Sequence, residues 1–150
     1  MGLETKKILP FLTSVQLLLI LNDPTQPVKS FHKSFPDFIT DPSCHADVRF
    51  YISLGGLHLE LAINCLRVMN DGLEQNLLSL PNYALNSEIQ DLQTRVENKI
   101  SIALQYACQF WHNHLTKSEG DFANVISSLH FLLEKKFLAW LEVLSVLGAL

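Results

Sequence analysis

Three side chains in the segment "SFHKSFPDF" (30–38) carry groups that could do chemistry. His32, Ser34 and Asp37 offer a base, a hydroxyl nucleophile and a carboxylate. Serine hydrolases, however, place the nucleophile on a strained turn of the GxSxG type, and no such pattern surrounds Ser34. The segment therefore does not predict a hydrolase, and we expect no turnover of esters.

Metal ligation is the second chemistry to consider, because histidine and cysteine occur together in two places. Imidazole and thiolate groups suited to zinc are present at Cys44, His45, His58 and Cys65. Two of these are adjacent and the remaining spacing matches no usual zinc pattern. The "HNH" motif places His112 and His114 two residues apart, so on a helix their rings point to different sides. The sequence predicts no metal site.

Several classes of function are disfavoured by composition and motifs. No GxxxxGK[ST] phosphate loop occurs, so the chain is not an NTPase by itself. The net charge is −4 and no lysine- or arginine-rich stripe is present, which argues against nucleic-acid binding. Three cysteines at irregular spacing indicate reduced thiols rather than a disulfide framework, and hence a cytoplasmic protein.

His32 lies next to an expected helix start. Ser34 precedes Asp37 by three residues, the spacing of a capping pair, and Pro36 suits a first turn, which predicts a short helix from Ser34 through Ile39. Helix N-termini have unpaired N–H groups that bind anions. Two readings remain open for this segment. In one, His32 and Lys33 complete an anion site at the helix start; in the other, the histidine is satisfied by backbone while three aromatic rings pack inward: Phe31, Phe35 and Phe38.

The elements that would position these residues are mostly helical. An amphipathic helix is expected over 8–21, with a signal peptide as the alternative, and extended pieces over 28–35 and 49–56, the second closed by a Gly-Gly turn. Apolar spacing then predicts helices over 57–70, 87–100, 100–115, 122–137 and 138–150. We expect a mainly α protein, a helical bundle or stack with a small N-terminal part containing one or two short strands.

Apolar surface is the last general expectation. The chain is 48% hydrophobic and only 17% charged, which leaves apolar side chains to meet a partner. The helix over 100–115 places Ile102 or Ala103, Tyr106, Phe110 and His114 on one stripe. Beside that stripe lie Ala107, Trp111 and Leu115. The chain also stops inside an apolar helical run, "VLGAL", which suggests truncation at the C-terminus.

Five segments, in order, resemble one family. They are "VKSFHKSFPDFITDPS", "RFYI", "HLELAINCLRVMN", "ALQYACQFWHNHL" and "FLLEKKFLAWLEVLSVLG". Together they are similar to NACHT-family (STAND, NLR-like) signalling NTPases of mushroom-forming fungi, in which a P-loop module is followed by a winged-helix domain and a helical region. The resemblance implies a partial winged-helix-like region over 1–54 and a helical domain over 55–150, with the phosphate loop and the magnesium-binding acid upstream in an intact parent.

The resemblance also implies roles for individual residues. His32 corresponds to the histidine that contacts the β-phosphate of ADP in the closed state, Ser34 and Phe35 match small-polar and aromatic positions, and Asp37 fills the acidic one. A nucleotide site would include His32, Lys33 and Ser34 only together with an upstream NTPase module. Pro36, Cys44-His45 and Gly55-Gly56 depart from the family pattern, which suggests a degenerate loop after the short helix.

The expected function is a non-catalytic regulatory relay in a NACHT-type signalling ATPase. No cofactor is expected for this chain alone, and ADP or ATP for an intact parent. Expected partners are proteins or the rest of a larger chain, with no nucleic acid, no membrane span and homo-oligomers through exposed apolar helices. The alternative is a stand-alone helical interaction module that docks through the 102–111 helix and the C-terminal apolar helix.

Overall fold

Helices make up most of the described chain. A computed structural model describes residues 19–20, 29–30, 32–43, 51–81 and 85–149. The chain divides into two compact units, an N-terminal unit of residues 1–53 and a helical unit of residues 54–150. The expected mainly α class is confirmed.

The described part of the N-terminal unit holds one short strand pair and one short helix. Strand β1 (Leu19–Ile20) pairs antiparallel with β2 (Lys29–Ser30). A pairing of two residues is too short to define a winged helix. Leu19–Ile20 is extended, so the helix expected over 8–21 is wrong at its end, and residues 8–18 lie outside the described residues.

Helix α2 (Ser34–Thr40) begins at Ser34, as predicted. Ser34 is nevertheless the first helical residue rather than the cap, and no side-chain cap bond is made from the preceding Lys33. The helix has no buried residue. The inward packing expected of Phe38 is wrong, because 55% of this residue is exposed. Phe35 is half-buried, and Phe31 lies outside the described residues.

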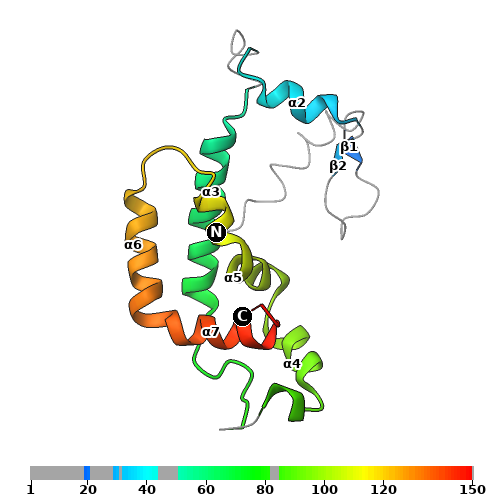
Figure 1. The fold of residues 1–150 in the computed structure, drawn as a ribbon, viewed down its shortest axis with the longest axis vertical. Coiled ribbons are helices and arrows are strands. Elements are labelled where there is room, and N and C mark those ends of the chain that lie inside the picture. The colour runs from blue at the N-terminus through cyan, green and yellow to red at the C-terminus, as the bar shows by residue number, and fades with distance from the viewer. Residues whose placement is uncertain (1–18, 21–28, 31, 44–50, 82–84, 150) are drawn as a thin grey trace, which may run out of the picture. The chain divides into compact units, whose positions relative to one another are not determined.

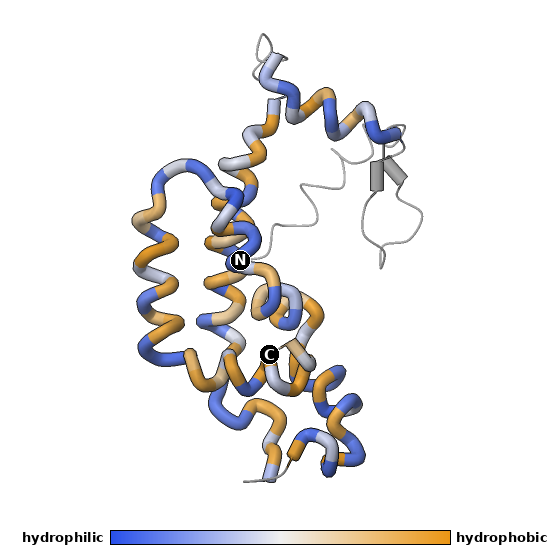
Figure 2. The backbone as a smooth tube through the Cα atoms, in the orientation of Figure 1, coloured by the Kyte–Doolittle hydropathy of each residue, from blue (hydrophilic) through white to orange (hydrophobic). Residues whose placement is uncertain are grey.

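Six helical segments build most of the helical unit, and Figure 1 shows α6 running alongside α3 while α7 crosses below them. Helix α3 is the centre, because both α5 and α6 pack against it. Figure 2 shows hydrophobic and hydrophilic residues alternating along these helices, as expected for amphipathic segments. The bounds are α3 (Leu54–Gly72), α4 (Leu92–Lys99), α5 (Ile102–Leu115), α6 (Ala123–Phe131), a π-helix η3 (Leu132–Lys136) and α7 (Phe137–Val146).

Helix α3 starts earlier than the sequence predicts. The Gly-Gly turn expected at Gly55-Gly56 is wrong, since both glycines lie in the first turn of α3. The N–H of Glu119 donates to the carbonyl of Gly55 over 3.1 Å, and a Cβ at Gly55 would lie 2.7 Å from the Cβ of Glu119. Glycine is therefore needed here for the close approach of the α5–α6 connection, not for a turn.

The helix predicted over 87–100 is divided in two. A 3₁₀ turn η2 (Asn86–Glu88) ends because Ile89 is extended (φ −93°, ψ 100°), and α4 begins at Leu92. Val96 and Ile100 are buried, as their spacing predicts. Ser101 then starts α5 by accepting the N–H of Leu104 on its hydroxyl over 3.2 Å.

Helices α6 and α7 meet through η3, whose wider turn accompanies the change in helix direction in Figure 1. The ammonium group of Lys136 donates to the carbonyl of Leu73 over 2.8 Å, just past the end of α3. A positive charge is favourable at this end of a helix, where carbonyl groups lack partners. Lys136 thereby ties the bend to the end of the central helix.

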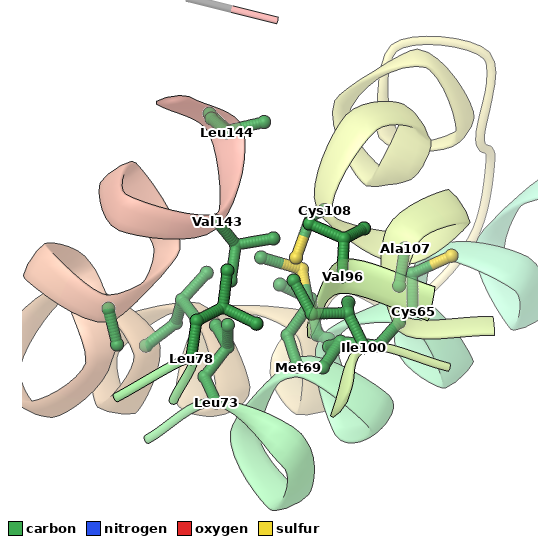
Figure 3. Close-up of a cluster of buried hydrophobic side chains, with 14 of the residues drawn as sticks. Cys65, Met69, Leu73, Leu78, Val96, Ile100, Ala107, Cys108, Val143 and Leu144 are labelled. Atoms are coloured by element: carbon green, nitrogen blue, oxygen red, sulfur yellow. The ribbon is translucent and has the colours of Figure 1, made fainter. Parts of the chain in front are cut away.

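The core lies between these helices (Figure 3). Its most buried large side chains come from α3, α5, α7 and η3 and from the residues that directly follow α3 and α4, and are Leu66, Met69, Leu73, Ile100, Cys108, Leu132 and Val143. Leu57, expected on the buried face of α3, is instead exposed, because the buried face turns toward Ala62 and Leu66. Cys65 and Cys108 are free and buried, and burial raises the pKa of the Cys108 thiol to about 12. This thiol is protonated at neutral pH.

None of the helices in the described part of the chain is both long enough and apolar enough to cross a membrane.

Candidate functional site

The segment at the start of α2 holds the residues for which the family resemblance implies contact with a phosphate. His32 Nδ1 accepts the backbone N–H of Ser34 over 3.1 Å and lies 2.8 Å from the Ser34 hydroxyl. The imidazole thus serves as the N-terminal hydrogen-bond partner that no cap side chain provides. His32, Lys33 and Ser34 are all exposed. The His32 ring is open to solvent rather than enclosed by hydrocarbon.

Electrostatics at this helix start are mixed. Lys33 adds a positive charge beside the N–H groups, while Asp37 places a carboxylate in the first turn. A carboxylate there competes with a phosphate for the positive end of the helix. With only seven residues, α2 also offers a small dipole. The three residues by themselves do not form a complete anion site, and a phosphate would need further groups from another part of a larger protein.

Neither of the two sets of residues considered above as metal ligands comes together as a metal site in the described part of the chain. His112 is exposed with its ring edge-on to Trp111, while His114 turns toward α3, so the two imidazoles of "HNH" have different surroundings, as expected. Cys44 and His45 lie outside the described residues. Among the described residues, no three metal-ligating side chains gather in one place.

A polar cluster that the sequence did not reveal joins α3 to α5. Nδ1 of His58 lies 3.0 Å from Nδ1 of His114, and the hydroxyl of Tyr106 lies 2.6 Å from Nε2 of His114. Both rings of this histidine pair, His58 and His114, are half-buried. Two imidazoles are only half of the ligand set that a tetrahedral metal site needs, so the geometry indicates a hydrogen-bonded contact between helices.

The histidine pair holds one proton between its facing nitrogens. In one arrangement, Nδ1–H of His114 donates to Nδ1 of His58, and Nε2 of His114 accepts the hydroxyl proton of Tyr106. In the other, Nδ1–H of His58 donates to Nδ1 of His114, and Nε2–H of His114 donates to the tyrosine oxygen. The pKa of His114 is lowered, first by desolvation and then by the charges of His58 and Lys117. The cluster therefore favours an uncharged His114.

A second feature of α5 is a row of exposed apolar side chains. The α5 row consists of Ile102, Tyr106 and Phe110, which are 85%, 45% and 41% exposed. They recur every four residues, and the Tyr106 and Phe110 rings are in contact, with centroids 5.0 Å apart. The opposite face of the same helix is buried through Leu104, Ala107 and Cys108. Helix α5 thus has one apolar face in the core and another open to solvent.

The sequence supplied part of this picture. It placed Tyr106, Phe110 and His114 on one stripe; the structure exposes Tyr106 and Phe110, while His114 is half-buried against α3. The contact of His114 with His58 was missed, because 55 residues separate them along the chain. Their only signal was that each is a histidine on an otherwise apolar helical stripe.

Comparisons of the chain with models of protein families, with curated proteins and with solved structures found no match. The structure by itself defines the class, a mainly helical protein with an exposed apolar helix face.

Proposed function

We propose that the chain is a non-catalytic regulatory segment that works by protein–protein contact, as the helical relay of a cytoplasmic NACHT-type signalling ATPase. The observation that carries the contact function is the α5 row. Three large side chains at four-residue spacing form a continuous apolar strip, which is the pattern by which helices dock into grooves or against other helices.

The energetic argument for a partner is direct. Full burial of one large apolar side chain stabilises a complex by about 1.5–3 kcal/mol. The row is also free of charged residues along its length, so a partner would not need to desolvate an ion there. The partner surface is therefore an apolar strip of another protein or of a larger parent chain, and homo-oligomers would use the same chemistry.

The relay part of the proposal is supported by the ordered resemblance of five segments and by the exposed His32 ring. In an intact parent, an upstream NTPase module would supply the nucleotide and the missing anion ligands. His32, with Lys33 and Ser34, would contact the ADP phosphate and favour the inactive state, and loss of this contact would release the helical region. The N-terminal unit would then belong to a winged-helix-like domain.

A dye-binding experiment on the isolated chain tests the contact function. Ile102→Ser with Phe110→Ser removes two side chains of the row and leaves Tyr106, which contacts His114, in place. We expect the fluorescence of an apolar-surface dye to fall by about half or more, and any self-association seen by light scattering to be lost. Because neither side chain belongs to the buried core, the free energy of unfolding should fall by no more than about 1 kcal/mol per substitution, with the larger loss from Phe110, whose ring contacts Tyr106.

The matched control is Ile126→Ser with Leu138→Ser, which removes two exposed apolar side chains from α6 and α7. Equal loss of dye binding in both double variants would refute a specific α5 row. A monomeric wild-type chain that binds no dye would argue for an autonomous helical module instead of a segment that needs a partner.

The relay function is tested in a full-length parent with His32→Ala. We expect lower retention of ADP and higher basal oligomerisation, because a contact made only in the inactive state has been removed. Nucleotide analysis of the purified protein and size-exclusion chromatography measure the two effects. The control is His130→Ala, which alters an exposed histidine on α6. Unchanged ADP retention and oligomer size in His32→Ala would rule out the relay, while leaving the contact function of the α5 row standing.

A further inference from the structure

We propose that the histidine pair is a proton-sensitive contact that holds the first turns of α3 against the last turns of α5 and releases them on acidification. The inference is independent of the proposed function, since it concerns only how two helices of the helical unit are joined. Its basis is the short contact between two like nitrogens, each of which can either carry or accept a proton.

Counting protons shows which state cannot keep the contact. The neutral pair holds one proton between the nitrogens. One further proton can be taken up on an outer nitrogen, and the contact survives. A second further proton leaves an N–H on both facing nitrogens, so that two donors and two positive charges oppose each other across 3.0 Å. The doubly charged pair must therefore separate.

The groups around the histidine pair determine how readily it takes up a proton. From α5, Tyr106 contacts His114, and just after α5 the ammonium group of Lys117 disfavours added positive charge. A carboxylate on this side is that of Glu119, whose side chain lies over Gly55, one turn before His58 on α3, but it is not among the causes of the lowered pKa of His114. Desolvation adds to the effect of Lys117, and the net result is a lowered pKa for His114.

The direction of the pH effect follows from this lowered pKa. A histidine whose pKa is lower in the folded protein binds fewer protons there than when released. Its contribution to stability is complete above the ordinary value of 6.5 and is lost as the pH falls through 6.5 toward the lowered value. Acidification therefore opens the contact, and alkaline conditions close it.

Opening would be local, because the two halves of α3 differ in burial. The part of α3 before Ala62 has no buried residue, while the part after it enters the core. Near His58, α3 is also held by the bond from the N–H of Glu119 to the carbonyl of Gly55 and by Leu59, which packs against the edge of the core and lies close to Gly120. Loss of the histidine contact would free the first turns of α3 and leave the half around Leu66 in place.

Nuclear magnetic resonance of the full chain tests the inference. The amides of residues 58–61 should lose about five- to tenfold in hydrogen-exchange protection, corrected for intrinsic rates, between about pH 7.5 and about pH 5.5. The amides around Leu66 should keep their hydrogen-exchange protection over the same pH range. In His58→Gln, which cannot take up a proton, this pH-dependent loss should disappear and the pKa of His114 should rise. The control is His112→Gln, which changes an exposed histidine on α5, the helix of His114, and this variant should behave like the wild type.

Three results would overturn the inference. The first is equal protection of residues 58–61 at both pH values in the wild-type chain, which needs no variant. The second is an unchanged pKa of His114 in His58→Gln. The third is a pH dependence in His58→Gln equal to that of the wild type. If His58→Gln does not fold, His114→Gln removes the other partner and must abolish the same pH dependence.

Discussion

Replacing Leu66 by alanine is expected to destabilise the helical unit by about 2–5 kcal/mol. Leu66 is fully buried in the core, on the helix α3 against which α5 and α6 pack. The substitution removes apolar contacts and leaves a cavity that helices held on several sides cannot fill. Because a domain of this size has about 5–15 kcal/mol of stability in total, the variant should unfold at much lower urea concentration, as followed by circular dichroism.

The same substitution at an exposed position is the control. Leu138 on α7 is 71% exposed, so Leu138→Ala should change the free energy of unfolding by less than about 0.5 kcal/mol. Equal losses in the two variants would mean that α3 is not the centre of the core. This outcome would also remove the reason to treat the exposed side chains as surface available to a partner.

Replacing Gly120 by alanine should cost about 2–3 kcal/mol, the second largest effect expected. Gly120 has φ +131°, a conformation that side chains rarely allow, and a Cβ there would lie 2.9 Å from a methyl group of Leu59. The methyl group can move aside, but the backbone cannot change φ without displacing the connection that follows α5. The loss should appear in urea unfolding and as a disturbed resonance of His58, which directly precedes Leu59 on α3.

Gly148→Ala separates these two causes. Gly148 also has a positive φ, +65°, but nothing lies within 4 Å of a Cβ placed there. Only the backbone cost of about 1 kcal/mol is expected. A Gly120→Ala variant no less stable than Gly148→Ala would show that the connection does not hold the first turns of α3.

Together these expectations describe how the helical unit would serve a relay. A rigid core around Leu66 keeps α3, α5 and α6 together, and the α5 row is presented on one side of that core. The first turns of α3, by contrast, have no buried residue, and their contacts include the histidine pair, the connection through Glu119 and Gly120, and the half-buried Leu59. A stable platform with one weakly held end suits a segment that must pass on a conformational change.

Much of the fold follows from local patterns. Apolar residues at three- and four-residue spacing predicted α3, α5, and the α6–α7 pair close to their observed bounds, because one turn of helix repeats every 3.6 residues. Ser34 was correctly predicted to begin α2. Where a single residue breaks the pattern, as the extended Ile89 does between η2 and α4, periodicity alone did not show the break.

The sequence by itself determined that the protein is mainly helical and that α5 has two apolar stripes, since both follow from residue spacing along one helix. Only the tertiary structure decided which stripe is buried, because that depends on where α3 lies. It also decided that Gly55 lies under Glu119 and that His58 meets His114. Those contacts join residues far apart in the chain, and their energies depend on distances that no local pattern encodes.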